Sequence, residues 1–385
     1  MLNECMRILV DARHLGNGQQ TGVGEYTVQL LRALFRSDTE NEYILLTSGM
    51  RRPDLPLPTP FSHIHVAAPN KLLNASIAFA RRPTLDRLVG GRIDLVFLPN
   101  LNFVAPNPLI PTVLTIHDLS WKHSPQYYSH KMRLWHRTVQ PARLIGDAAR
   151  VIVPSQSTHD DLVRAFQKSS DQIAVVPHGI DSAFQPRPEP RDHGVRSRYN
   201  LPKRYALYMG TLEPRKNIAA ILDAVAAYRE RTRDDLHLVL AGGWGWNARD
   251  LKTRLATRYA QQTIHHLGYV PSQDRPALYR NAAVFIWPSK YEGFGLPILE
   301  AMACGTPVIT SHTSSMPEVA GSAAILIDPF DPRDITVALE HLLHSKNLSA
   351  RLRSAGLERA KTFSWDTAAR RTLEVFSSAV KKPLS

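Results

Sequence analysis

Short apolar runs alternate along the first half of the chain with longer stretches that have helical spacing. The runs are rich in β-branched residues, and each is followed by turn or helix-start residues. This alternation is typical of repeated β–α units around a parallel sheet. The predicted strands are MRILVDA, EYILLT, HIHVAA, DLVFLP, TVLTIHD, RVIVPS and IAVVPH. They predict an N-terminal Rossmann-like domain over residues 1–182.

A segment rich in proline and charge, residues 181–204, interrupts this alternation. It lacks periodicity, which predicts an interdomain linker. After it the pattern resumes with YALYMGT, LHLVLAGG, IHHLGYV, AVFIWPS, PVITS and AAILID. These runs predict a second Rossmann-like domain over residues 183–366. The chain after Pro332 is mostly helix-forming, and we expect a helix at about 367–385 to pack back on the first domain.

Length and composition agree with a two-domain globular enzyme. The chain has 385 residues, of which 43% are hydrophobic and 21% charged. Only Cys5 and Cys304 are present, so neither a disulfide framework nor a zinc site is indicated. Arg7 and Asp11 interrupt the first apolar run, and nowhere do eighteen apolar residues follow one another. We therefore expect a cytoplasmic protein without a signal peptide or membrane span.

The chain is strongly basic, with a formal net charge of +13. Residues 71–150 contain eleven Lys or Arg and four Asp or Glu, a balance of +7. Such a field attracts polyanions: anionic lipid headgroups, a pyrophosphate-bearing substrate or nucleic acid. We expect no nucleic-acid partner, because no helix-turn-helix, RNP signature or zinc finger accompanies the charge. An ordinary solvated basic surface remains the alternative.

The densest chemical signal is the string SKYEGFGLPILEAMACGTPVITS at residues 289–311. Glu292 would lie at the carboxyl end of a strand, where open parallel sheets bind ligands. The Gly-Phe-Gly turn after it frees backbone N–H groups at a helix start. Glu300, within that helix, can accept two hydrogen bonds from a ribose diol. Two merely solvated glutamates are the alternative.

Two further strand ends carry candidate chemistry. Arg215 and Lys216, in TLEPRKN, can neutralise a pyrophosphate leaving group. Gly22 and Gly24, in TGVGEY, form a turn that lets backbone approach a ligand. The turn lacks the third glycine of the dinucleotide fingerprint, so a nicotinamide cofactor is not supported.

His117 ends the predicted strand TVLTIHD, where a lone histidine is more often structural. Trp244 and Trp246, in AGGWGWN, can either stack on a base or sugar or cover the core. Trp365 is expected to anchor the last helices.

Taken in order, these motifs resemble the signature of family 4 retaining glycosyltransferases of the GT-B fold, over essentially the whole chain. The resemblance implies an α/β protein with two Rossmann-like parallel-sheet domains facing each other across a cleft that holds the donor. It implies that Glu292 and His117 are the catalytic residues. The donor-binding residues that it implies are Gly22, Gly24, Arg215, Lys216, Val270, Phe294, Gly295, Leu296 and Glu300.

The resemblance also implies the chemistry. Glu292 would hold the hydroxyls of the sugar, while the departing phosphate oxygen accepts the proton of the acceptor on the same face. Cationic side chains and helix N-termini would replace a metal, so we expect no metal and no cofactor besides the nucleotide-sugar substrate. Domain closure would exclude water.

Among such enzymes the chain looks most similar to bacterial mannosyl- or rhamnosyltransferases of O-antigen and exopolysaccharide assembly. We expect GDP-mannose as donor, with UDP- or dTDP-sugars as alternatives. The expected acceptor is a glycan or a polyprenyl-diphosphate-linked saccharide, and the basic stretch would favour peripheral contact with an anionic membrane. A phosphorylase, an epimerase or a non-catalytic sugar-nucleotide binding protein are the competing readings.

Overall fold

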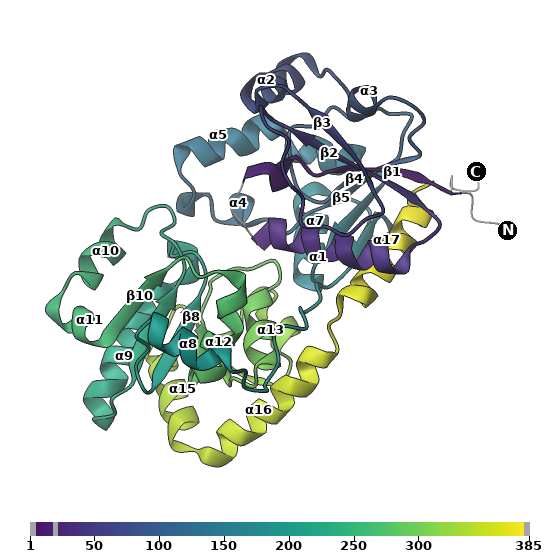
Figure 1. The fold of residues 1–385 in the computed structure, drawn as a ribbon. Coiled ribbons are helices and arrows are strands. Elements are labelled where there is room, and N and C mark those ends of the chain that lie inside the picture. Colours follow the sequence, from purple (N-terminus) through teal and green to yellow (C-terminus); the bar gives the residue numbers. More distant parts are fainter. Residues whose placement is uncertain (1–4, 18–21, 381–385) are drawn as a thin grey trace. The chain divides into compact units, whose positions relative to one another are not determined.

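The structure, a computed structural model, describes residues 5–17 and 22–380. The chain divides into two compact units (Figure 1). The first unit comprises Met1–Leu119, His130–Gly179 and Ser364–Ser385, and the second comprises Ser120–Ser129 and Ile180–Phe363. A short segment of the N-terminal half therefore belongs to the second unit, and the C-terminal end of the chain belongs to the first.

Among the described residues, the first unit is built on a parallel sheet of seven strands. Its strands are β1 (Arg7–Asp11), β2 (Glu42–Ser48), β3 (Ser62–Val66), β4 (Leu95–Leu98), β5 (Thr112–Thr115), β6 (Arg150–Val153) and β7 (Ile173–Val175). Their order is β3-β2-β1-β4-β5-β6-β7, with β1 paired to both β2 and β4. The strand order reverses between β1 and β4, as in doubly wound folds.

Helices cover the sheet of the first unit. They are α1 (Gly22–Ser37), α2 (Asn70–Ala80), α3 (Leu85–Val89), α5 (His130–Val139), α6 (Pro141–Asp147), α7 (Gln156–Phe166) and α17 (Trp365–Val380), with short 3-10 turns at Arg13–Asn17 and Ser170–Gln172. The C-terminal helix α17 lies along α1 (Figure 1). Its Trp365 and Phe376 are buried in the same core as Phe97 of β4, so α17 completes this unit.

The second unit repeats this plan with six parallel strands among its described residues. They are β8 (Tyr205–Met209), β9 (His237–Ala241), β10 (Ile264–Gly268), β11 (Val284–Trp287), β12 (Val308–Ser311) and β13 (Ala324–Ile327). Their order is β10-β9-β8-β11-β12-β13, so the reversal falls between β8 and β11, which pair through Leu207 and Phe285. All the predicted strands of both halves are present, and the prediction of two Rossmann-like parallel-sheet domains is confirmed.

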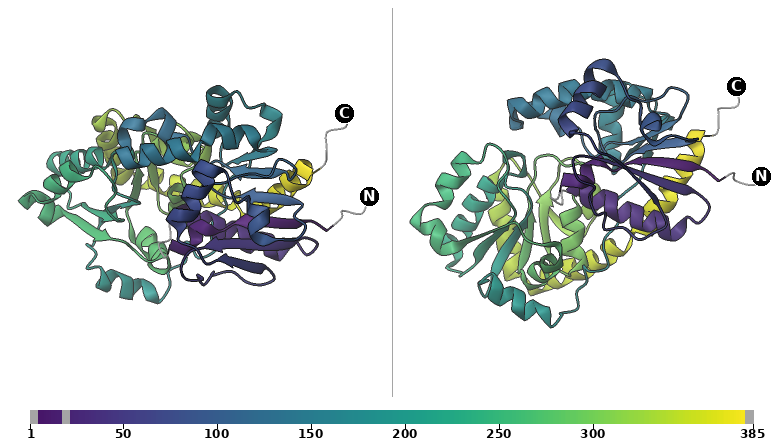
Figure 2. Two further views of the ribbon diagram at one scale, coloured as in Figure 1. Left: turned by 90° about the horizontal axis from the view of Figure 1, so that it is seen from above. Right: turned by 45° about the horizontal axis from the view of Figure 1, so that its top comes forward.

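Helices of the second unit lie on both sides of its sheet (Figure 2). The helices that belong to this unit are α4 (Ser120–His123), α8 (Arg191–Arg198), α9 (Ile218–Thr232), α10 (Arg249–Leu255), α11 (Arg258–Thr263), α12 (Arg275–Asn281), α13 (Leu296–Ala303), α14 (Met316–Ala320), α15 (Pro332–His344) and α16 (Lys346–Lys361), with 3-10 turns at Pro125–Tyr127, Pro214–Lys216 and Ser272–Asp274. None of the helices in the described part of the chain is long and apolar enough to cross a bilayer.

The expectation of an irregular linker over residues 181–204 is wrong for α8. Asp192 and Val195 of this helix are buried, and Arg280 of α12 binds the Asp192 carboxylate at 2.6 Å. A helix of eight residues, half of them charged, has no apolar stripe to reveal it in the sequence. An ion pair with α12 and one buried valine hold it in place.

Candidate active site

The candidate site begins at the point where the strand order of the second unit reverses. The loop after β8 carries Arg215 and Lys216 on a 3-10 turn, and the loop after β11 carries Glu292. Because β8 and β11 are neighbouring parallel strands, their carboxyl ends bring the two loops together. Sequence spacing placed each residue at a strand end, and the topology makes those two ends adjacent.

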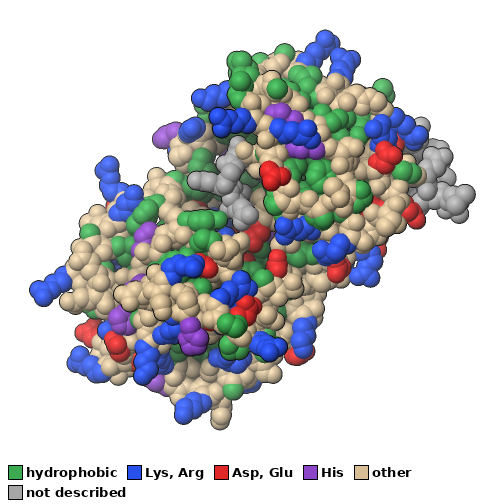
Figure 3. All heavy atoms as spheres, viewed as in Figure 1, with side chains coloured by type: hydrophobic (Ala, Val, Ile, Leu, Met, Phe, Trp, Pro, Cys, Tyr) green, Lys and Arg blue, Asp and Glu red, His purple; other side chains and the backbone are tan. Residues whose placement is uncertain are grey.

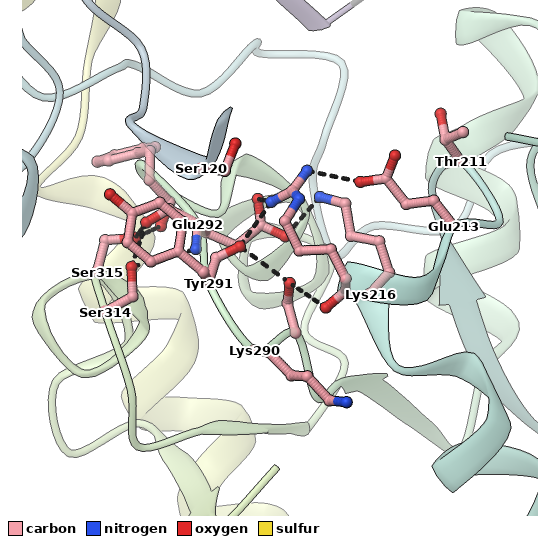
Figure 4. A network of polar contacts seen from close by, with 12 residues as sticks. Ser120, Thr211, Glu213, Lys216, Lys290, Tyr291, Glu292, Ser314 and Ser315 are labelled. Atoms are coloured by element: carbon pink, nitrogen blue, oxygen red, sulfur yellow. Dashed lines mark hydrogen bonds and ion pairs between the residues drawn. The ribbon is translucent and has the colours of Figure 1, made fainter. Parts of the chain in front are cut away.

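Four side chains from these loops form a buried cluster, here called the charge quartet: Glu213, Arg215, Lys216 and Glu292 (Figure 4). Nη1 of Arg215 donates to Oε2 of Glu292 at 2.9 Å, and Nζ of Lys216 donates to Oε1 at 2.5 Å. Nη2 of Arg215 donates to Oε1 of Glu213 at 2.7 Å. Each oxygen of Glu292 therefore holds one cation, and Arg215 lies between two carboxylates.

Among the residues of the quartet, Glu292 stays ionised although it is buried. Burial alone would raise the pKa of Glu292, but Arg215 and Lys216 outweigh it and lower that pKa to about 2. Burial and the neighbouring guanidinium of Arg215 lower the pKa of Lys216, whose ammonium lies 4.5 Å from the ring centroid of Trp287. Burial raises the pKa of Glu213 in spite of its ion pair with Arg215.

Hydrogen bonds between the backbone of the loop that carries Glu292 and the side chains of Ser314 and Ser315 hold this loop in place. The backbone N–H of Glu292 donates to Oγ of Ser314 at 3.1 Å, and the Ser314 hydroxyl donates back to the Glu292 carbonyl. The Ser315 hydroxyl is shared between the carbonyls of Glu292 and Phe294, at 3.0 and 2.8 Å. Nη1 of Arg215 also donates to the carbonyl of Tyr291 at 2.6 Å. The backbone at Glu292 is thus held by hydrogen bonds with both serines.

The helix start predicted after Glu292 is present at α13. Gly295 caps it with φ of 106°, a backbone conformation that favours glycine, and a Cβ there would come within 3.1 Å of the Ile298 side chain. Leu296 is the first helical residue and Glu300 lies one turn further on. The ring of Phe294 packs edge-on against Phe363 in the core, which leaves its backbone for any contact with a donor.

Glu300 is buried and accepts a hydrogen bond from the hydroxyl of Tyr279 at 2.7 Å. Burial and this carboxylate raise the pKa of Tyr279 well above its ordinary value, so its hydroxyl stays a donor. Val270, one of the predicted donor-binding residues, follows β10 at the sheet edge, with β9 between β10 and β8. Its side chain is buried, so a donor would meet its backbone.

The remaining predicted residues lie in the first unit. His117 follows β5, and its Nε2 donates to the carbonyl of Pro99 at 2.9 Å, which leaves Nδ1 as the acceptor nitrogen. Burial lowers the pKa of His117 to about 4, so its imidazole is neutral at neutral pH. Gly22 and Gly24 fall within the first turn of α1 and not in a turn before it, while Thr21 lies outside the described residues.

The structure also shows site features that the sequence did not suggest. Glu213, Ser314 and Ser315 had no assigned role. The one hint in the sequence was the position of Glu213, an acidic residue two positions before Arg215. The sequence left Trp244 and Trp246 open between stacking on a ligand and covering the core. Trp244 is 38% exposed and contacts His266 and Lys252. The ring of Trp246 stacks on Tyr128, which comes from the segment Ser120–Ser129.

Comparison with known proteins gives matches along both units. A model of glycosyltransferase family 4 matches residues 20–184, and a model of glycosyl transferases group 1 matches residues 195–359. O-antigen chain mannosyltransferase B of Escherichia coli is 32% identical over 371 residues, which cover 92% of this chain and 96% of that one. Serotype-specific mannosyltransferase WbdA of Escherichia coli is 25% identical over 97% of this chain and 48% of its own length.

Solved structures share the fold. Sucrose-phosphate synthase from Thermosynechococcus elongatus matches with a TM-score of 0.75 at 21% identity, over 97% of this chain and 98% of that one. HepE from Anabaena, in complex with UDP and glucose, matches with a TM-score of 0.71 at 17% identity, over 97% and 99%. Since the likeness to the first mannosyltransferase runs over nearly the full length of both chains, this chain belongs to glycosyltransferase family 4.

Proposed function

We propose that this glycosyltransferase transfers mannose, with retention of anomeric configuration, from GDP-mannose to a growing cell-surface polysaccharide. The observation that carries the proposal is the charge quartet at the strand-order reversal. It supplies two buried cations beside a carboxylate that stays ionised. The 32% identity with an O-antigen chain mannosyltransferase supports mannose as the sugar.

In this proposal Arg215 and Lys216 bind the diphosphate and neutralise the charge that grows as the glycosidic bond breaks. Glu292 holds the sugar and stabilises the positive charge at its anomeric carbon, while Glu300 accepts hydrogen bonds from the ribose. The N-terminus of α13 adds a partial positive charge. With these groups in place the reaction needs no metal, and the leaving phosphate takes the proton of the acceptor hydroxyl.

A screen of donors tests the proposal. Thermal stabilisation and donor hydrolysis are measured with GDP-mannose, UDP-glucose and dTDP-rhamnose in the presence of a chelator. We expect a response to GDP-mannose, and a product whose anomeric coupling constant matches the donor. A response only to a UDP- or dTDP-sugar would replace the donor, and an inverted product would refute retention.

Three variants test the site. We expect Lys216→Ala, Glu292→Ala and His117→Ala each to lower transfer by about a hundredfold or more while the protein stays folded. Arg353→Ala, an exposed cation of α16, serves as the matched control and should transfer normally. If all three variants transferred like the wild type, the site assignment would be wrong.

We further propose peripheral contact with an anionic membrane through α5, which would bring the enzyme to a lipid-linked acceptor. Leu134 is 60% and Trp135 36% exposed on this helix, among Lys131, Arg133 and Arg137. Apolar and basic groups on one exposed helix suit an interface with anionic lipid. On the face seen in Figure 3, Lys and Arg side chains occur over both units and do not form a single patch. The contact should therefore depend on α5: Leu134→Ser with Trp135→Ala should abolish co-sedimentation with phosphatidylglycerol vesicles.

A further inference from the structure

The charges of the quartet balance one another. Two cations, Arg215 and Lys216, face two carboxylates, Glu213 and Glu292, and all four are largely buried. Glu292 spans the two cations, with one oxygen on each. Two oxygens bridging a guanidinium and an ammonium is also the arrangement that a phosphate group would adopt between them.

We propose that the Glu292 carboxylate and the donor diphosphate compete for the same two cations, and that the two anions exchange there during each catalytic cycle. Arrival of the diphosphate displaces the side chain of Glu292 and so frees it for the sugar. After transfer, the return of Glu292 to the cations promotes release of the nucleoside diphosphate. This inference rests on the proposed function, because it takes Arg215 and Lys216 as the diphosphate site.

Simple electrostatics requires the exchange. The diphosphate brings about two negative charges or more. If Glu292 kept its place, the diphosphate and Glu292 would together bring three or more negative charges. These charges, with Glu213 beside them, would compete for two cations in a site shielded from water. Like charges in such surroundings repel strongly, so one anion has to leave.

The contacts decide which parts move and which stay. Ser314 and Ser315 hold the backbone of Glu292, so the displacement is a rotation of its side chain and not a movement of the loop. Glu213 binds Nη2 of Arg215, whereas Glu292 binds Nη1. When Glu292 leaves, Glu213 still orients the guanidinium, and the groups made available are Nη1 of Arg215 and Nζ of Lys216. Glu213 is thus a positioning residue.

Calorimetric titration tests the exchange. GDP and UDP are titrated into the wild type and into Glu292→Gln, which keeps the shape of the side chain but removes its charge. We expect the variant to bind the diphosphate about tenfold more tightly, although it transfers no sugar, because the competing anion is gone. Guanosine and uridine, which have no phosphate, should bind both proteins equally.

The matched control is Asp274→Asn, which neutralises another buried carboxylate of the second unit. Asp274 pairs with Arg198 at 2.8 Å and does not belong to the quartet, so its removal should leave diphosphate affinity unchanged. Melting temperatures check that each variant is folded. Glu292→Ala should also bind the diphosphate more tightly than the wild type. This result would show that the effect of Glu292→Gln comes from the lost charge and not from its amide group.

Two failures can be told apart. If the wild type binds GDP or UDP, Lys216→Ala weakens that binding, and folded Glu292→Gln binds equally or more weakly than the wild type, the exchange is refuted and the donor site stands. If neither the wild type nor any variant binds either diphosphate, the proposed function fails, and the exchange fails with it.

Discussion

The hydroxyl of Tyr279 in α12 donates a 2.7 Å hydrogen bond to Oε2 of Glu300 in α13. Both side chains are buried, so one oxygen of the carboxylate is oriented before any ligand arrives. We expect Tyr279→Phe to raise KM for the donor about threefold to tenfold with little change in kcat, because one hydrogen bond that orients Glu300 is lost.

Steady-state kinetics with varied donor measure this effect, and Tyr205→Phe is its matched control. Tyr205 is equally buried and donates to the carbonyl of Leu278 at 2.7 Å, outside the site. Both variants should lose about 1 kcal/mol of stability, and only Tyr279→Phe should change KM. An equal KM in the two variants would contradict the role of Glu300 in donor binding.

Removing Arg215 should destabilise the protein as well as inactivate it. Arg215→Met leaves Glu213 and Glu292 buried with a single cation between them, and we expect a loss of about 3 kcal/mol in the free energy of unfolding. Adding Glu213→Gln removes one of the uncompensated charges. Urea denaturation should therefore show the double variant to be more stable than Arg215→Met alone, and a further loss would contradict the coupling.

His117 should make stability depend on pH. Its pKa is about 4 in the folded protein because of burial, against about 6.5 when unfolded. Between these values the unfolded chain binds more protons, so stability falls as the pH drops from about 6.5 toward 4, by about 2 kcal/mol at pH 5. In His117→Gln that contribution should disappear.

Denaturation at pH 7 and at pH 5 measures how much the free energy of unfolding falls between these two pH values. The pKa of His178 beside it is also lowered by burial, so the variant should keep part of the acid sensitivity. His341→Gln, at an exposed position on α15, should behave as the wild type. If the wild type, His117→Gln and His341→Gln lost equal free energy of unfolding between pH 7 and pH 5, His117 would be accessible to water in the folded protein.

Gly22 offers a test of the predicted donor contact in the first unit. A Cβ at this position would meet no atom of the described residues within 4 Å, so their packing does not explain the glycine. We expect Gly22→Ala to fold normally and to lower transfer about tenfold or more, because the methyl group would intrude on the approaching donor. Gly146→Ala, where a Cβ also meets no atom within 4 Å, should transfer normally. Full activity of Gly22→Ala would make this glycine an ordinary helix start.

The local pattern of apolar and polar residues was sufficient to predict the strands of both sheets. It was insufficient to predict which distant segments contact one another. Each strand is a short apolar run, and the strand ends located Arg215, Lys216 and Glu292 correctly on loops. Which loops are neighbours depends on strand order, and β8 meets β11 only because the order reverses there. Site roles for all the predicted residues remain predictions.

Residues with short polar side chains or irregular surroundings were the ones that sequence reasoning missed. Ser314 and Ser315 act through hydrogen bonds to a loop more than twenty residues away, and serine is common in any loop. The helix α8 has no apolar periodicity to reveal it. Nothing in the segment Ser120–Ser129 indicates that Tyr128 will stack on Trp246.

The division of the chain has a practical meaning for exchanging donor specificity between relatives. A chimera cut once near residue 180 would transplant the C-terminal α17 away from the core that it completes with α1. The transplantable piece is Ile180–Phe363, and Ser120–Ser129 has to come from the same parent so that Trp246 keeps its partner. Chimeras within this family should therefore fold when the internal segment Ile180–Phe363 is exchanged together with Ser120–Ser129, and not when the two halves of the chain are exchanged.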